Sequence, residues 1–278
     1  MKRVRIRNFV ESAFYCHHKL KFLVACIILF IFIAIINIFR VGNIEGSNMI
    51  DVLFLSFCGP SANNSNLAID LQWLLIQLVL TALLGDFAFN QIFYKSNFLL
   101  VRAKSRTKIW IGQALYISIA VLIFFLIGFF VVAALSQIIL INGSNNWFHT
   151  ASSIYNIPSN IGKYQIIAQM FILLYLTSLC AVLLQSLISM LTKNVLIPLI
   201  LIMTSHIFAI NSGRINVFIV RWILGNQSMM VRHTLIDENI KNFSIQWSVV
   251  YNIVLILLIL IIGVHVINKM DILIEEKN

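Results

Sequence analysis

The chain has 278 residues, of which 60% are hydrophobic and 11% are charged, and Lys and Arg outnumber Asp and Glu by 20 to 10. Its apolar residues come in blocks of about 20, the length that crosses the hydrocarbon core of a bilayer as a helix. This composition excludes a soluble globular protein and predicts an integral membrane protein. Because the blocks are continuous instead of alternating in polarity, the fold class is expected to be all-α.

Residues 1–21 precede the first apolar block and carry six Lys and Arg side chains. In a helix, their apolar residues would share one side: Ile6, Phe9, Val10, Ala13 and Phe14. We expect an amphipathic helix lying on the inner leaflet, with a merely positive tail as the alternative. The rest of the chain, 22–278, is expected to be a single transmembrane domain.

Six membrane-spanning helices are predicted, at about 22–39, 69–89, 110–140, 164–191, 195–211 and 247–267. Lys and Arg are concentrated on one side of these spans: six precede the first, five separate the second and third, one separates the fourth and fifth, and two lie in the tail, which is 14 of the 20. The positive-inside bias places both termini and the 90–108 loop in the cytoplasm. The first outer loop, 40–68, contains a short apolar stretch that is expected to pack on the outer surface.

The second and fourth predicted spans each carry a stripe of polar and small residues at helical spacing. The stripes consist of Gln77, Thr81 and Gly85, and of Thr177, Ala181, Gln185 and Ser189. Such stripes most often pack helices together, because small residues allow close approach and polar ones bond across the contact. The alternative is that they line a central conduit or form the interface with a second protomer.

The cytoplasmic loop 90–108 gathers five cations without an acid: Lys95, Arg102, Lys104, Arg106 and Lys108. In a helix, Lys95, Arg102 and Arg106 would share a side, which a loop that only sets topology does not need. The loop is therefore expected to contact lipid headgroups or to dock onto a cytoplasmic protein.

The longest outer segment, 212–246, is apolar enough around 215–231 to enter the membrane, but it contains Arg221. A full crossing would bury this side chain at a cost of about 2.5–3.5 kcal/mol and would move the C-terminus outside. We therefore expect a re-entrant or interfacial segment, with a seventh span as the alternative.

Motifs of catalysis and of metal binding are missing from the sequence. There is no G-x-S-x-G, no H-E-x-x-H and no phosphate-binding loop, and His206 and His265 have no second ligand at helical spacing. No paired carboxylates cross the membrane region, which disfavours an ion-coupled carrier. We expect no catalytic residue, no metal, no cofactor in this chain and no nucleic-acid partner.

One stretch resembles a known family. The segment "YKSNFLLVRAKSRTKIWIGQ" contains an Arg-x-x-Ser-Arg pattern with a following Trp, at Arg102, Ser105, Arg106 and Trp110, and the chain ends in "NKMDILIEEKN". Both resemble permease subunits of type-2 ATP-binding-cassette exporters, particularly the small ones of Gram-positive bacteria.

This resemblance implies a bacterial plasma-membrane protein that pairs with a second permease copy or paralogue. Two separate cytoplasmic ATPase subunits would bind ATP and Mg, and the 90–108 loop would be the coupling helix that docks onto them. The implied function is outward movement of an amphipathic substrate such as an antimicrobial peptide. The alternative is a non-transporting immunity or scaffold protein that binds a toxin or a partner protein.

Overall fold

A computed structural model describes residues 19–42, 44, 46–62, 66–93, 105–140, 151, 155, 157, 162–215, 217–237, 240 and 242–269, without the side chains of 19, 86–93 and 213–217. Within these residues the regular secondary structure is entirely helical, as the sequence predicts. Residues 1–18 of the expected interfacial helix and residues 94–104 of the basic loop lie outside the described part. The first described helix begins at Lys19.

Six long helices overlap the six stretches that were predicted to be spans. They are α2 (Lys19–Val41), α4 (Leu67–Phe93), α6 (Arg106–Ile139), α8 (Lys163–Thr192), α9 (Leu196–Ile215) and α11 (Ile245–Lys269). Five of them are long and apolar enough to cross a bilayer, whereas the apolar stretch of α9 is shorter, at Leu196–Ser212. The chain is therefore a helical protein with the apolar helices of a membrane protein.

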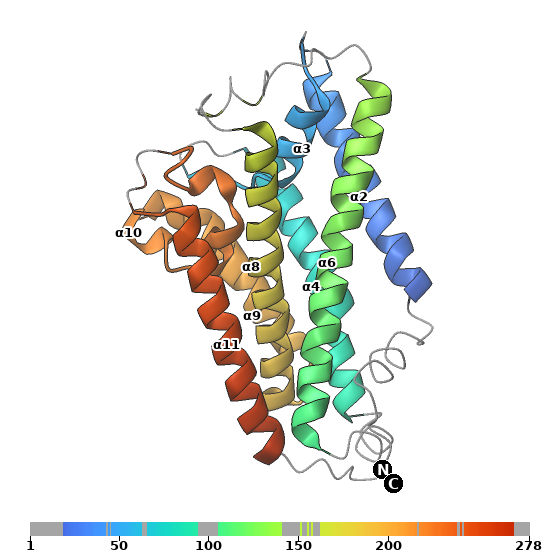
Figure 1. Ribbon diagram of the computed structural model, residues 1–278, viewed down its shortest axis with the longest axis vertical. Coiled ribbons are helices and arrows are strands. Elements are labelled where there is room, and N and C mark those ends of the chain that lie inside the picture. The colour runs from blue at the N-terminus through green and yellow to red at the C-terminus, as the bar shows by residue number, and fades with distance from the viewer. Residues whose placement is uncertain are drawn as a thin grey trace.

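Consecutive long helices run in opposite directions, so that the chain rises in α2 and falls in α11 in the view of Figure 1. The start of α6 and the end of α11 meet at the lower end, where the guanidinium of Arg106 donates to the carbonyl oxygen of Asn268 at 3.3 Å. The α8–α9 turn is at the same end. It is tight because Lys193 adopts the left-handed conformation (φ 49°) and the Asn194 side chain accepts from the first backbone N–H of α9 at 2.7 Å.

The apolar stretch of the first outer loop forms a helix of its own, α3 (Met49–Phe57). A capping box starts this helix: the Asn48 side chain accepts from the Asp51 backbone N–H, and the Asp51 carboxylate accepts from the Asn48 N–H. Every residue from Ile50 to Phe57 is buried, against α2, α4, α6 and α8. The expectation of a segment lying on the outer surface therefore understated its burial.

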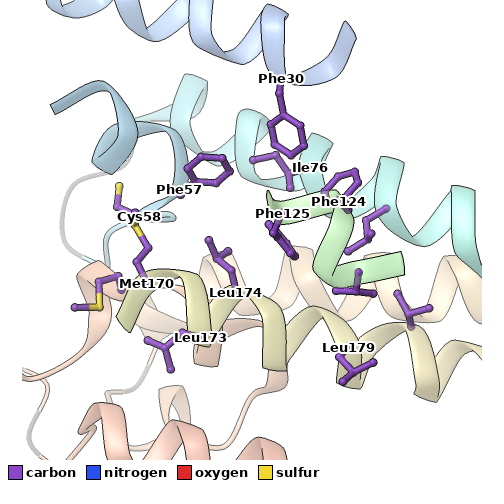
Figure 2. Close-up of a cluster of buried hydrophobic side chains, with 14 of the residues drawn as sticks. Phe30, Phe57, Cys58, Ile76, Phe124, Phe125, Met170, Leu173, Leu174 and Leu179 are labelled. Atoms are coloured by element: carbon purple, nitrogen blue, oxygen red, sulfur yellow. The ribbon is translucent and has the colours of Figure 1, made fainter. Parts of the chain in front are cut away.

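The main core fills the space between α2, α3, α4, α6 and α8. Figure 2 shows side chains of this core: Phe30, Phe57, Cys58, Ile76, Phe124, Phe125, Met170, Leu173, Leu174 and Leu179. Most of them lie between these helices, whereas Leu173 and Leu179 lie on the other side of α8. The ring of Phe30 lies 5.0 Å from that of Phe124 and 5.8 Å from that of Phe57, centroid to centroid. Gly128 allows this packing, because a Cβ there would overlap the Phe30 ring. Close packing of this kind holds helices together where lipid is as apolar as the side chains.

Candidate functional site

The two polar stripes lie against each other across the α4–α8 contact. The Ser178 hydroxyl donates to the side-chain oxygen of Gln77 at 3.1 Å, and the side chain of Gln185 lies directly against Gly85. All seven predicted stripe residues are buried: Gln77, Thr81, Gly85, Thr177, Ala181, Gln185 and Ser189. In this conformation the stripes pack two helices of one chain together. A conduit or a protomer interface along them remains a prediction that would require α4 and α8 to separate.

A second set of buried polar side chains continues from α8 into α11 and the outer segment. The Asn252 amide donates to the Thr177 hydroxyl at 3.1 Å, while the Ser248 hydroxyl lies 2.8 Å from Nε2 of His233. On its other side, the His233 ring contacts the Met229 carbonyl through Nδ1 at 3.1 Å. Thr177 was predicted from the sequence as a stripe residue, whereas Asn252 and Ser248 lie in the last predicted span and were not singled out.

Burial lowers the pKa of His233 to about 4, so its ring is neutral at physiological pH. A neutral imidazole donates from one nitrogen and accepts at the other. Nδ1 faces a carbonyl, which can only accept, so the proton belongs on Nδ1 and the Ser248 hydroxyl donates to Nε2. His233 is thus a neutral connector between the outer segment and α11.

In the outer segment, residues 212–246, the described residues between α9 and α11 form short elements. They are α10 (Val217–Val220), η1 (Leu224–Ser228) and η2 (Met230–Arg232), with η1 packed against α8, α9 and α11 (Figure 1). None approaches the roughly 20 residues that a helix needs to cross a bilayer. The described residues of this segment therefore do not form the seventh span that the sequence left open.

Arg232 fixes the outer segment from inside the protein. The side chain is 0% exposed. Its guanidinium donates to the carbonyls of Ala209 (2.6 Å) and Ile210 (2.7 Å) in α9, to that of Pro60 (2.9 Å) after α3, and to the Asn226 side chain (2.7 Å). One cation therefore ties three separate parts of the chain together. Sequence reasoning missed it, because nothing local distinguishes Arg232 from the other arginines.

Arg221 has a different environment, which we call the aromatic cradle. Its guanidinium carbon lies 4.3 Å from the ring centroid of Phe218, 5.2 Å from that of Trp222 and 5.8 Å from that of Trp247. Such distances are typical of cation–π contacts. The side chain is half-buried, in contrast to that of Arg232.

Only two of the five predicted coupling cations are described. Lys108 is exposed, and Arg106 contacts Asn268 as above. Lys95, Arg102 and Lys104 lie outside the described residues, so their placement stays a prediction.

The first turns of α6 are fastened to the last turns of α11, and we call this the α6–α11 contact. Besides the Arg106 bond, the Thr107 hydroxyl donates to the Asn268 side chain at 3.4 Å, and the indole N–H of Trp110 donates to the Leu260 carbonyl at 3.1 Å. Trp110 is fully buried and lies flat against Gly263, where any side chain would overlap the indole. The sequence indicated Trp110 as part of a motif, but not its partner helix.

The lone histidine of α9, His206, packs edge-on against Trp73 with ring centroids 5.1 Å apart. Among the described residues, no three His, Cys, Asp or Glu side chains lie close enough to hold a metal ion. Cys26, Cys58 and Cys180 are free and buried. Burial raises the pKa of the Cys58 thiol to about 12, which leaves it unreactive as a nucleophile.

Comparison with known sequences gives one family. Residues 22–273 match the family described as "Protein of unknown function (DUF2705)". No curated protein matches the chain. No solved structure matches it either.

Proposed function

Because the chain belongs to the DUF2705 family, whose description names no activity, we propose a function from its own residues: it is the membrane-spanning permease subunit of an ATP-binding-cassette exporter. It moves an amphipathic substrate, such as a peptide or antimicrobial, outward across the bacterial plasma membrane. A separate cytoplasmic ATPase subunit hydrolyses the ATP, and a second permease copy or paralogue completes the pathway.

The α6–α11 contact is the observation that carries this proposal. The basic loop 90–108 leads directly into α6, and the beginning of α6 is bonded to α11 through Arg106, Thr107 and Trp110. A protein docked on the loop would therefore move two membrane helices together. A permease driven by a separate ATPase requires such a mechanical connection between its cytoplasmic loop and its membrane helices. A loop that only sets topology does not require it.

The topology that the proposal needs has six spans with both termini in the cytoplasm. We count α9 as the sixth span, since its 20 residues reach about 30 Å, the thickness of a typical hydrocarbon core. The outer segment would then be re-entrant, which its burial against α8, α9 and α11 supports. The excess of Lys and Arg on the 90–108 side supports the orientation.

Two sets of variants test docking and transmission separately. Lys95→Glu with Arg102→Glu should abolish co-purification of an ATPase in mild detergent, because it reverses two charges of the proposed docking loop. Neither residue belongs to the described α6–α11 contact, so this change tests docking alone. Gly263→Val should leave the complex assembled but uncouple ATP hydrolysis from export, because its side chain would push Trp110 away from α11. Ile262→Val, on the exposed face of the same helix, is the matched control.

The proposal is wrong if no ATPase accompanies the wild-type chain at a fixed ratio under conditions where the chain is active. Normal coupling in Gly263→Val, with the protein folded, would remove the role given to the α6–α11 contact. Either result can be obtained without knowing the substrate in advance, because coupling is measured as the stimulation of the ATPase subunit's ATP hydrolysis by the permease.

The second candidate function is a non-transporting immunity or scaffold protein. The full burial of both polar stripes within one chain favours it, because these residues then stabilise the fold instead of contacting a substrate. The discriminating measurement is protection of cells against a toxin when the partner ATPase is deleted. Protection that persists without any ATPase would favour this second function.

A further inference from the structure

The Arg221 guanidinium is a cation that no part of the described chain neutralises. Its Nε is buried without a hydrogen-bond partner, and none of the described residues accepts a hydrogen bond from the rest of the group. Its contacts are the three rings of the aromatic cradle. Arg232, 11 positions further along, has a full set of acceptors. The two terminal nitrogens of Arg221 are therefore available to a ligand from outside the chain.

The backbone of Arg221 and the rings around its side chain are held by hydrogen bonds and a ring contact. The Trp247 indole N–H and the Gln227 amide both donate to the Arg221 carbonyl, at 3.2 and 2.7 Å. The Trp222 and Trp247 rings meet edge to face with centroids 5.1 Å apart, and the Tyr251 hydroxyl donates to the Trp222 carbonyl at 2.9 Å. A cation held this way loses little conformational entropy on binding.

With α11 as a membrane span, the cradle is expected at the depth of lipid headgroups. Trp247 is in the first turn of α11, and 18 residues of helix separate it from His265 near the other end. This separation corresponds to about 27 Å, close to the thickness of the hydrocarbon core. Trp and Tyr concentrate at such boundaries because one part of the ring system is apolar and the other bonds to water.

We propose that Arg221 and the aromatic cradle bind the phosphodiester of a phospholipid headgroup. The exposed rings of Phe218 (64%) and Trp222 (48%) would contact the glycerol and upper acyl chain, while the guanidinium donates to the phosphate oxygens. Arginine suits this ligand, because its planar fork matches two phosphate oxygens at once. Next to the cradle, Val250 and Val254 of α11 are exposed and would contact the acyl chains.

By the charge bias of the loops this is the outer leaflet, opposite the basic 90–108 loop. The site does not depend on the exporter proposal, since it requires only a membrane protein. The cradle joins α10 to α11, so a bound headgroup would also brace the outer segment against the last span.

The test measures binding of phosphatidylglycerol to the full chain in detergent by native mass spectrometry. Arg221→Gln should weaken this binding about tenfold, the loss expected for one charge-assisted contact. Arg40→Gln is the matched control, because it removes one positive charge at the end of α2, away from the cradle, where Arg40 already donates to Asn37. Its affinity should equal that of the wild type.

Two further arms separate the possible ligands. Diacylglycerol with the same acyl chains lacks the phosphate and should bind at least tenfold more weakly than phosphatidylglycerol. Free glycerol 3-phosphate tests whether the phosphate is recognised without a lipid, and it should not compete at millimolar concentration. Equal binding of diacylglycerol, or competition by glycerol 3-phosphate, would overturn the headgroup assignment.

The proposal also fails if Arg221→Gln binds phosphatidylglycerol as the wild type does. It fails equally if an Asp-containing amphipathic peptide, but not the lipid, binds in an Arg221-dependent way, since the ligand would then be a carboxylate. If the Gln variant does not fold, Arg221→Lys decides: it keeps the charge and loses the planar fork, so severalfold weaker binding is expected and unchanged binding overturns the proposal.

Discussion

Replacing Arg232 by Met removes the guanidinium from the interior while keeping an unbranched side chain of comparable reach. The four short hydrogen bonds, between 2.6 and 2.9 Å, join α9, the loop after α3 and the outer segment. Without them, the Pro60 carbonyl and the Asn226 side-chain oxygen each lose a charged donor inside the protein. The contacts between α9, the loop after α3 and the outer segment should therefore open before the rest of the helical bundle unfolds.

The magnitude follows from two opposing terms. Four hydrogen bonds to a charged group, at about 1.5 kcal/mol each at the low end, would give about 6 kcal/mol. The desolvation cost of the buried guanidinium, which the variant no longer bears, offsets part of this. We expect a net loss of about 3–5 kcal/mol, the range seen when one partner of a buried charged network is removed.

Two assays measure this loss. Thermal unfolding of the purified chain in detergent should show a midpoint lowered by on the order of 10 °C. Locally, the Cys58 thiol should begin to react with a maleimide, because the Val231 backbone N–H bonds to the Cys58 carbonyl at 3.4 Å and this contact should open. The labelling uses a background in which Cys16, Cys26 and Cys180 are replaced by Ala.

Arg40→Gln, at the same end of the bundle, serves as the control. An unfolding midpoint within about 2 °C of the wild type in Arg232→Met, together with an unreactive Cys58, would refute the reasoning. Arg232→Lys should fall between the two, because it keeps the charge but cannot supply three donor nitrogens in a fixed plane.

Three further predictions concern packing, topology and pH. Ala181→Trp should reduce folding and assembly together, since the site is fully buried; a folded, assembled variant that only fails to export would instead support a conduit. Cysteines at Asn211 and Gln246, both exposed, should label from the same side of intact cells, and labelling from opposite sides would contradict the re-entrant topology. The folded pKa of His233 lies below its unfolded value, so the unfolded state binds more protons and stability should fall as pH drops from about 6.5 to about 4; His233→Asn should remove this part of the pH dependence, as measured by thermal unfolding.

The topological prediction uses Asn211 because the structure rules out a neighbouring position. Ser212 looks like a loop residue in the sequence, but it lies in α9 with 1% of its surface exposed, and it accepts from the Asn226 amide at 2.9 Å. A cysteine there would stay unlabelled whichever side it faced. The helix end continues beyond the apolar block, and sequence patterns place such ends only loosely.

The sequence by itself determined where the long helices lie. Each predicted span overlaps one observed helix, and none extends more than one residue beyond it, because a block of about 20 apolar residues is a local property of the sequence. The helical spacing of the two stripes was also readable, since positions four residues apart share a face. The spacing could not predict that the two faces contact each other, because this contact joins distant parts of the chain. Gly85 and Gln185, for example, are 100 positions apart.

Tertiary structure alone decided which polar residues are enclosed. Arg221 and Arg232 belong to the same apolar outer segment, yet one lies among aromatic rings with free donors and the other is fully buried among carbonyls. The burial of α3 and the fastening of Trp110 to α11 are decided in the same way. The physical reason is that a hydrogen bond or a ring contact depends on the position of a backbone carbonyl or side chain that is distant in the sequence. The local spacing of residues does not determine that position.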